Sequence, residues 1–425
     1  MEVNGWPMLP LIELTDNFDS RRVPVREADR RPGPYPYYGA SGIVDRVDNY
    51  LFEGEHLLIA EDGENLRTRQ TPVAFLANGK FWVNNHAHVV RGNSRADTRF
   101  LSYALSQTDI SGYLTGSTMP KLTQGNMNQI RVVAPPLAVQ QSIAAALGAL
   151  DDKIELNRRM NATLEAMTRA LFQSWFVDFD PVRAKLDGRQ PRGLDPATAA
   201  LFPDHLEYSI IGKKPIGWEV TALDTVLAVL ETGGRPKGGV GGIMSGVPSV
   251  GAESIVSVGV FDFGKTKFVP VEFYEGMKKG HIESHDVLLY KDGGRPGEYE
   301  PHVSMFGDGF PFEKCCINEH VYRLRANERL SQEYLYFWMT SDFTFAEMRI
   351  KGTGVAIPGL NSTAVRSLAV LVPPRPVIEA FTRQAAPLVT QLLANAKQSR
   401  TLATLRDTLL PKLISGHLRL TNGNA

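Results

Sequence analysis

Residues 116–175 read GSTMPKLTQGNMNQIRVVAPPLAVQQSIAAALGALDDKIELNRRMNATLEAMTRALFQSW, and residues 354–413 repeat this pattern at an offset of 238 residues (354 − 116). The shared positions are Gly116, Pro120, Leu122, Pro135-Pro136, Asn157, Leu164 and Leu171 in the first copy and Gly354, Pro358, Leu360, Pro373-Pro374, Asn395, Leu402 and Leu409 in the second. Each match is weak alone, but a constant offset over the whole stretch predicts an internal duplication.

The repeat extends upstream of this stretch at smaller offsets. Three earlier segments recur at offsets of 212 (217 − 5), 230 (292 − 62) and 234 (318 − 84): Gly5-Trp6 as Gly217-Trp218, Leu57-Leu58 with Asp62-Gly63 as Val287-Leu288 with Asp292-Gly293, and Asn84-Asn85-His86 as Asn318-Glu319-His320. The duplication therefore covers two halves, which begin near Gly5 and Gly217.

The first part of each half is predicted to be mixed α and β. His56–Ala60 and Asp286–Tyr290 are short β-type runs between Gly and Pro turns. Asp97 and Ser331 each precede an apolar-periodic segment, in the position of a helix N-cap.

The second part of each half is predicted to be one long helix that starts after a Pro-Pro pair. Apolar residues recur there at intervals of three and four, the spacing of a coiled-coil seam: Leu147, Leu150, Ile154, Leu164, Met167, Leu171 and Trp175, then Leu388, Leu392, Leu402, Leu405, Leu409 and Leu413. From about Val139 to Val177 the helix would measure about 58 Å. Asn157 and Asn395 lie on this stripe, either as partly exposed positions or as a polar pair that sets the register of the two helices.

Composition excludes several classes of protein. The chain of 425 residues has 46 Lys and Arg against 46 Asp and Glu. This balance argues against a polybasic protein held to nucleic acid by bulk charge, while local basic faces remain possible. Two adjacent cysteines, Cys315 and Cys316, supply neither a disulfide framework nor a cysteine-rich zinc site. Met1–Trp6 lacks the pattern of a signal peptide, and the apolar run Ile143–Leu150 is too short to span a bilayer, so we expect a soluble cytoplasmic protein.

Several segments resemble the specificity subunits of type I restriction-modification systems. They are Trp175–Lys185, Leu201–Asp204, Ile211-Gly212, Pro215–Trp218, Gly116–Leu122 leading into Ala134–Gln141, and Leu409–Gly416 at the chain end. The resemblance covers essentially the whole chain. The second copy departs from it at Arg375-Pro376 and Glu379, and in a glycine-rich loop from Gly233 to Gly246.

The resemblance implies an α+β fold with internal duplication and pseudo-twofold symmetry. In that family two tandem mixed α/β target recognition domains, separated by two long antiparallel coiled-coil helices, each read one half of a split asymmetric DNA site. The subunit bridges two methyltransferase subunits, and restriction (motor-nuclease) subunits join them for cleavage. Such a chain is non-catalytic, and S-adenosylmethionine, ATP and Mg are expected on the partner subunits. Adenine methylation and DNA cleavage would thus be directed by this chain.

These expectations divide the chain into six parts. They are residues 1–136 (recognition domain 1), 137–179 (central spacer helix), 180–216 (a linker rich in Pro, Gly and charge), 217–374 (recognition domain 2), 375–416 (C-terminal spacer helix) and 417–425 (tail).

Sequence motifs for methyl transfer or nucleotide binding are absent or weak. An adenine-methyltransferase Asn-Pro-Pro-Tyr motif is absent, since Ala134 and Val372 precede the proline pairs. Gly259–Thr266 has Walker A spacing, but Lys267–Val271 after it reads as extended chain, whereas a phosphate loop needs a helix there. A β-turn with DNA-facing lysines is the favoured interpretation. The alternatives are an ATPase using Gly264-Lys265-Thr266 and a helical scaffold without sequence readout.

Two pairs of equivalent turn residues have two interpretations. Asp62 and Asp292 are typical of structural turns, and no metal-ligand set is predicted. His86 and His320 are either shared turn or core residues or contacts to a DNA groove. Cys315-Cys316 is predicted to be buried thiol packing.

Basic residues outside the long helices are the candidate DNA contacts, since Arg and Lys suit phosphates and guanine edges. They are Arg21, Arg22, Arg67, Arg69, Lys80, Arg91 and Lys121 in the first half, and Arg235, Lys237, Lys265, Lys267, Lys278, Lys279, Arg295 and Lys351 in the second. The predicted helix-packing residues are Leu150, Ile154, Asn157, Leu164, Leu171, Leu388, Leu392, Asn395, Leu402 and Leu409. No catalytic residue is predicted. Because the loops of the two halves differ, two different half-sites are expected.

Overall fold

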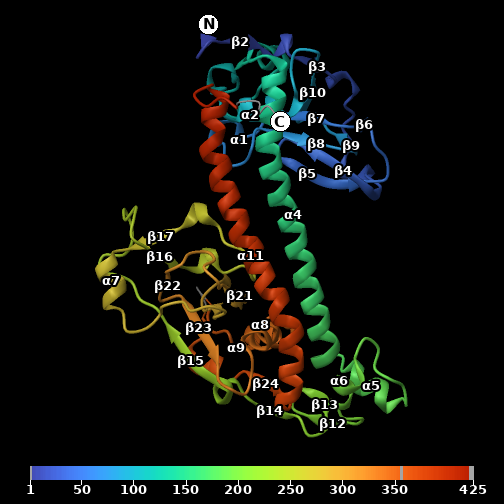
Figure 1. Cartoon of the computed structure of the whole chain (residues 1–425), viewed down its shortest axis with the longest axis vertical. Coiled ribbons are helices and arrows are strands. Elements are labelled where there is room, and N and C mark those ends of the chain that lie inside the picture. Colours follow the sequence, from blue (N-terminus) through green and yellow to red (C-terminus); the bar gives the residue numbers. More distant parts are fainter. Residues whose placement is uncertain (1, 355–357, 421–425) are drawn as a thin grey trace. The chain divides into compact units, whose positions relative to one another are not determined.

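The computed structural model describes residues 2–354 and 358–420. The chain divides into two compact units, a first unit of residues 1–154 with 401–425 and a second unit of residues 155–400. Two long helices, α4 (Leu137–Phe176) and α11 (Arg375–Ile414), each contribute to both units (Figure 1). Among the described residues, no helix has the length and apolarity that crossing a membrane requires.

The first unit contains three small sheets, with strand orders β3-β10-β7-β8, β5-β4-β9-β6 and β1-β2-β11. Its strands are β1 (Glu2–Val3), β2 (Trp6–Pro10), β3 (Thr15–Asn17), β4 (Pro32–Gly39), β5 (Gly42–Val47), β6 (Phe52–Glu53), β7 (His56–Ala60), β8 (Ala74–Ala77), β9 (Lys80–Val83), β10 (Ala87–Gly92) and β11 (Arg131–Val133). Its short helices are α1 (Asn65–Thr68), α2 (Thr98–Ser106) and α3 (Gln124–Gln129).

In the second unit, α4 is followed by the linker segment, which forms α5 (Asp180–Leu186), α6 (Pro196–Ala200) and the hairpin of β12 (Leu206–Ser209) and β13 (Gly212–Pro215). Its other strands are β14 (Glu219–Ala222), β15 (Leu227–Thr232), β16 (Val247–Val250), β17 (Lys267–Val269), β18 (Val287–Tyr290), β19 (Gly294–Arg295), β20 (Glu298–Tyr299), β21 (His302–Met305), β22 (Cys316–Ile317), β23 (Val321–Ala326) and β24 (Ala369–Val372). The remaining helices are α7 (Val271–Gly276), α8 (Gln332–Met339), α9 (Asp342–Lys351) and α10 (Ser362–Arg366).

The sheets of the two units share strand order and register. The order β15-β23-β18-β21 in the second unit matches β3-β10-β7-β8 in the first. Leu57 lies opposite Val90 in the first unit, and Val287 lies opposite Leu324 at the corresponding place in the second. In both units a strand of the second sheet also pairs in parallel with a later strand, β4 with β9 and β16 with β22. The duplication read from the sequence is therefore present in the backbone pairing.

The predicted local elements are confirmed. Strands β7 and β18 occupy the two β-type runs, although β18 begins at Val287, after Asp286. The side chain of Asp97 accepts a hydrogen bond from the Phe100 N–H at the start of α2, and Ser331 accepts one from the Tyr334 N–H at the start of α8.

Each unit has its own apolar core. In the first unit, α2 packs on β7 and is joined by Leu147 of α4 and Leu413 of α11. In the second unit, aromatic rings from α4, α8 and α11 pack together, and the Phe176 ring lies 4.9 Å from Tyr334 and 5.2 Å from Phe381 between centroids. The long helices are thus held by the cores of the units as well as by each other.

The seam of the long helices departs from the predicted spacing at two positions. Met167 and Leu405 were predicted on the seam, but they are 53% and 45% exposed. Thr168 is buried instead of its neighbour Met167, and its hydroxyl donates to the Leu164 carbonyl at 2.9 Å. A straight helix drifts about 20° per heptad, so a strict 3.5-residue seam moves onto the adjacent residue.

The seam carries a buried polar cluster around Asn157 and Asn395. Asn157 is fully buried, and its Nδ2 donates to Ser399 Oγ at 3.2 Å and to the Asn395 carbonyl at 3.3 Å. Asn395 is 4% exposed, and its Nδ2 donates to Asn161 Oδ1 at 3.0 Å. Because position 157 contacts 399 while position 161 contacts 395, the helices run antiparallel here. Positions 157 and 395 are equivalent in the repeat, as are 161 and 399, since each two are 238 residues apart (395 − 157 and 399 − 161). The contact of 157 with 399 is therefore equivalent to the contact of 395 with 161, and the arrangement is self-complementary.

Removal of one partner of this cluster should destabilise the second unit. We expect Asn157→Ala to lower the free energy of unfolding by about 1–3 kcal/mol, because Asn395 and Ser399 lose a buried partner. The double variant Asn157→Leu with Ser399→Ala should recover part of this loss, since both side chains of that hydrogen bond are then replaced by apolar groups. Urea unfolding of the full chain measures both, with Gln384→Ala on the exposed face of α11 as the control. A single variant as stable as the parent chain would contradict the expectation.

Candidate nucleic-acid interface

The predicted contact Arg22 is engaged inside the first unit. Its side chain is 14% exposed, pairs with Glu61 at 2.8 Å and donates to the Ala87 carbonyl at 2.9 Å. Glu61 also lies 3.3 Å from Lys121 Nζ. Burial acts to raise the pKa of Glu61, but Arg22 and His88 outweigh it and lower that pKa. Arg22 therefore holds β10 and its neighbours together, while Lys121, which is about half exposed, remains accessible.

The other predicted cations of the first unit are exposed. Three of them donate to backbone carbonyls that order their side chains: Arg21 to Leu51 at 2.8 Å, Arg67 to Gly116 at 2.9 Å and Arg69 to Thr108 at 2.7 Å. Lys80 Nζ lies 4.6 Å from the centre of the Tyr50 ring. Arg91 pairs with Asp16 in the backbone ladder of β10 and β3, and its side chain makes no hydrogen bond or ion pair with a described residue. An ordered, exposed guanidinium loses little side-chain entropy when it binds a phosphate.

In the second unit, two glycines bring separate basic segments together. A Cβ on Gly280 would lie 2.7 Å from the Gly233 Cα, and a Cβ on Gly233 would lie 1.6 Å from the Ile317 carbonyl oxygen. This close approach places the segment that carries Arg235 and Lys237 against Lys278-Lys279. The three lysines make no hydrogen bond or ion pair within the described part of the chain. The sequence predicted these residues one by one, and the contact between the two glycines brings their segments together; we refer to Arg235, Lys237, Lys278 and Lys279 as the cationic group, in which Arg235 also pairs with Glu319 at 2.8 Å.

Four further candidates of the second unit lie outside this group. Lys265 pairs with Asp262 at 3.2 Å, Lys267 with Glu253 at 2.8 Å and Lys351 with Glu347 at 2.9 Å. Arg295 lies on β19 in a shallow pocket that also contains Glu298 and Glu300. Carboxylates at these distances offset the positive charge that a phosphate would meet.

The Walker-like segment does not form a phosphate loop. Phe263–Lys265 is a single 3-10 turn, whose start is capped by Asp262 accepting from the Gly264 N–H at 3.0 Å. Strand β17 follows at Lys267, where a phosphate loop requires a helix. The prediction that this segment is a turn followed by extended chain is confirmed.

The equivalent turns contain a repeated His–Asp pair. His86 Nδ1 lies 2.7 Å from Asp62 Oδ2, and His320 Nδ1 lies 2.7 Å from Asp292 Oδ2. The side chains of the two histidines are 51% and 43% exposed. Both histidines are therefore shared turn residues, as one interpretation held, and neither is a buried core residue.

The buried thiols show no reactive environment. Cys315 and Cys316 are free and buried, and burial raises the pKa of the Cys315 thiol to about 12 and that of Cys316 to about 11. Both therefore remain protonated at neutral pH and behave as apolar packing groups. Within residues 2–354 and 358–420, no group of three or more His, Cys, Asp or Glu side chains is placed to hold a metal ion.

Sequence reasoning missed a buried ionic centre in the second unit. Asp286 is fully buried, accepts from the Glu283 N–H at 2.7 Å and from Arg325 Nε at 2.8 Å, and also pairs with Arg323. Arg323 reaches Glu231 at 2.9 Å. An Arg on β23 opposite an apolar residue of β18 resembles a surface alternation in sequence, so no local signal marks it as buried.

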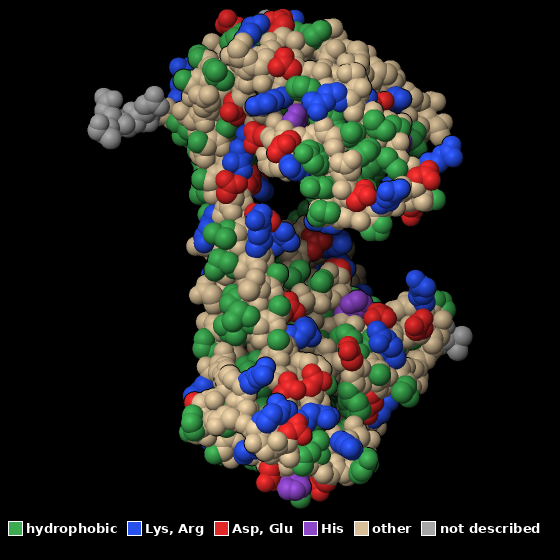
Figure 2. Space-filling view, turned by 90° about the vertical axis from the view of Figure 1, so that its right-hand side faces the viewer, with side chains coloured by type: hydrophobic (Ala, Val, Ile, Leu, Met, Phe, Trp, Pro, Cys, Tyr) green, Lys and Arg blue, Asp and Glu red, His purple; other side chains and the backbone are tan. Residues whose placement is uncertain are grey.

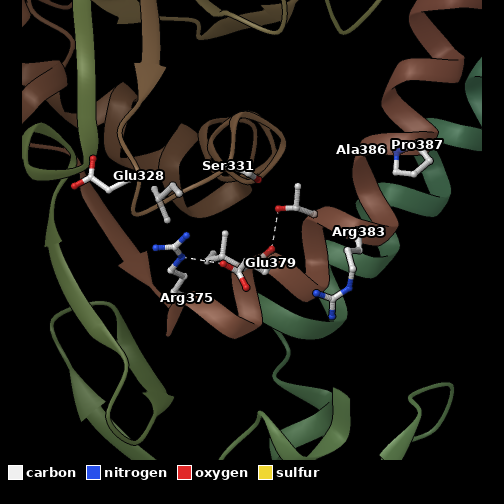
Figure 3. A pocket seen from close by; sticks show the side chains of 10 residues that line it. Glu328, Ser331, Arg375, Glu379, Arg383, Ala386 and Pro387 are labelled. Atoms are coloured by element: carbon white, nitrogen blue, oxygen red, sulfur yellow. Dashed lines mark hydrogen bonds and ion pairs between the residues drawn. The ribbon is translucent and has the colours of Figure 1, made fainter. Parts of the chain in front are cut away.

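A groove of about 630 Å³ beside the first turns of α11 was also missed. Arg375 and Glu379 line it and are joined at 2.8 Å. Figure 3 shows them with Glu328 and Ser331 from the neighbouring loop and with Arg383 one turn further along the helix. Its acidic and basic side chains are mixed, which gives no strong attraction for a nucleic acid.

Surface charge is mixed elsewhere as well. On the face shown in Figure 2, Lys and Arg side chains are interspersed with Asp and Glu, and no single-sign area dominates. The surface on this face is therefore mixed in charge, in keeping with the zero net charge of the chain. Binding of a polyanion would depend on local groups such as the cationic group of the second unit.

The most informative comparison concerns the first unit. A family model described as the type I restriction modification DNA specificity domain matches residues 5–166. The chain is similar to type I restriction-modification specificity subunits, and residues 5–166 carry the match to their DNA specificity domain. The match covers the sheets of the first unit and continues into α4, so the resemblance noted from the sequence is confirmed.

Relatives extend the similarity along the chain. The type I restriction enzyme MjaIX specificity subunit of Methanocaldococcus jannaschii is 25% identical over 91% of this chain and 88% of its own length. A putative specificity subunit of Haemophilus influenzae is 41% identical over 33% of this chain and 36% of its own. The crystal structure of the type I S subunit from M. genitalium superposes with a TM-score of 0.63 at 15% identity, over 97% of this chain and 99% of that one, which supports the fold.

Proposed function

We propose that each unit of this type I specificity subunit reads one half of a bipartite, asymmetric DNA site. The observation that carries the proposal is the shared sheet register of the two units combined with different loops. A common scaffold with different loops gives two similar readers of different sequences. The first unit presents exposed arginines held by backbone carbonyls, whereas the second presents the cationic group around Gly233 and Gly280.

Pseudo-twofold symmetry of the chain is part of this proposal. The equivalent contacts of Asn157 with Ser399 and of Asn395 with Asn161 are what an axis between the two copies would produce. Under such symmetry the chain would present equivalent surfaces to two methyltransferase subunits and would bridge them. The restriction subunits would join the same complex.

The proposed role is non-catalytic. Sequence recognition requires hydrogen-bonding groups that reach base edges and cations that reach phosphates. Methyl transfer and cleavage would take place on the partner subunits, which would hold S-adenosylmethionine, ATP and Mg. The basic residues described above would position the duplex, and loop residues would read its bases.

The test maps adenine methylation in cells that express the chain with its methyltransferase partner. We expect one split motif with two different halves. Replacement of residues 5–136 by the equivalent segment of another specificity subunit should change only one half of the motif. The parent chain, expressed with the same partner, is the control. Methylation without sequence preference, or a change in both halves after the exchange, would contradict the proposal.

A further inference from the structure

The His–Asp pair belongs to a larger arrangement that the two units repeat. In the first unit the His86 N–H donates to Asn84 Oδ1 at 2.8 Å, and in the second the His320 N–H donates to Asn318 Oδ1 at 2.9 Å. The residue after each aspartate donates its N–H to a proline carbonyl, Gly63 to Pro120 at 3.2 Å and Gly293 to Pro358 at 2.9 Å. The same hydrogen-bonded turn thus holds a half-exposed His–Asp pair in both units.

The imidazole rings are not needed to hold this hydrogen-bonded turn. The hydrogen bonds of this turn use the main chain of each histidine and the side chain of the asparagine two residues before it. The histidine carbonyl also accepts a bond, from the Glu61 N–H to His86 at 2.9 Å and from the Lys291 N–H to His320 at 3.0 Å. About half of each histidine side chain contacts solvent. An exposed ion pair contributes little to stability, so the fold does not account for keeping both rings.

Basic side chains lie near both pairs, each of them beside a glutamate. In the first unit the loop that starts at Gly116 lies beside Asp62 through its bridge to Lys121, and Arg67 donates to the Gly116 carbonyl. In the second unit Arg235 of the cationic group pairs with Glu319 at 2.8 Å, next to His320. The same Glu319 oxygen lies 3.4 Å from His320 Nε2. Candidate DNA cations therefore adjoin the repeated pair in each unit.

We propose that His86 and His320 are equivalent contacts to the DNA phosphate backbone, one in each recognition unit. A carboxylate only accepts hydrogen bonds, so Asp62 and Asp292 take the Nδ1 hydrogen, and a phosphate oxygen accepts from Nε2 when the ring carries both hydrogens. Two readers of different base sequences share only the backbone, so a polar group common to both suits that task. This inference rests on the proposed reading function. The contact of His320 is the weaker one, because the Glu319 carboxylate lies beside its Nε2.

Binding of the full chain with its methyltransferase to labelled DNA duplexes tests this inference. One duplex carries the mapped motif and one is scrambled. We expect His86→Ala to raise the Kd about tenfold for both duplexes, the loss of one charge-assisted hydrogen bond. His320→Ala should raise it about threefold. The methylated motif should stay the same. The control is His205→Ala, an exposed histidine paired with Asp204 at 2.7 Å outside the repeat, which should leave Kd unchanged.

A second measurement separates a direct contact from a structural effect. Duplexes with one neutral methylphosphonate at each successive position should show a position where the parent loses affinity and His86→Ala does not. The variants should melt within about 3 °C of the parent, because no core contact changes. Unchanged Kd in both histidine variants, or a changed motif, would overturn the inference while leaving the reading function intact. A parent complex that binds both duplexes equally would instead overturn the proposed function, and one that binds neither would overturn both.

Discussion

Lengthening α4 and α11 by seven residues each is expected to widen the gap between the two methylated half-sites by one to three base pairs. The insertions are placed after Ile154 and after Arg400, where the chain passes from one unit to the other. A heptad preserves the helical seam, so the contacts within each unit stay in phase. Seven residues add about 10.5 Å, which equals about three base pairs of duplex and sets the upper limit.

The rotation of the duplex favours the smaller values in this range. Each additional base pair turns a half-site by about 35°, whereas a heptad turns a helix by only about 20°. Methylation mapping in cells measures the gap directly. Insertion into α4 alone is the control, since it leaves α11 without a matching partner turn and should abolish methylation. An unchanged gap with methylation retained would contradict the role of the helices as a spacer.

Replacement of Asp286 by alanine is expected to lower the free energy of unfolding of the second unit by about 3–5 kcal/mol. Asp286 is fully buried and pairs with Arg323, whose side chain is 6% exposed. Without the aspartate, the Arg323 charge stays buried with fewer partners, and the desolvation penalty is no longer offset. Chemical unfolding followed by a probe in the second unit measures the loss.

The chain offers a matched control for this effect. Glu283 pairs with the same arginine at 2.7 Å, but its side chain is 59% exposed. Glu283→Ala should therefore cost less than about 1 kcal/mol, as exposed ion pairs do. The double variant Asp286→Leu with Arg323→Met should recover part of the stability lost in the single one, because both buried charges are then absent. Equal losses for Asp286→Ala and Glu283→Ala would contradict this account.

The predicted elements that proved right depend on local signals. Asp97 and Ser331 cap helices because their side chains reach a backbone N–H three residues on, which requires no distant contact. Both long helices start directly after a proline pair, which ends the preceding strand. The repeat offsets are visible because equivalent turns need the same Gly and Pro residues.

The candidate site was predicted only as a set of residue types. Arg22 and Arg91 look alike in sequence, yet Arg22 is enclosed by Glu61 and Ala87 while Arg91 faces solvent. Lys278 and Arg235 are far apart in the chain, and the close approach of their segments depends on two glycines that allow the backbones to touch. Which cations are available to DNA is therefore a property of long-range packing.

The sequence by itself determined the duplication, the two long helices and the family resemblance. Periodic apolar residues and repeated turn residues are local patterns, so they can be recognised without knowledge of the fold. The tertiary structure decided which of the charged residues are internal and which form a common surface. It also revealed the repeated His–Asp pair, in which the histidine and the aspartate are 24 residues apart in the first unit and 28 in the second. The physical reason is that burial and charge pairing depend on segments joined through folding, and neither leaves a local pattern in sequence.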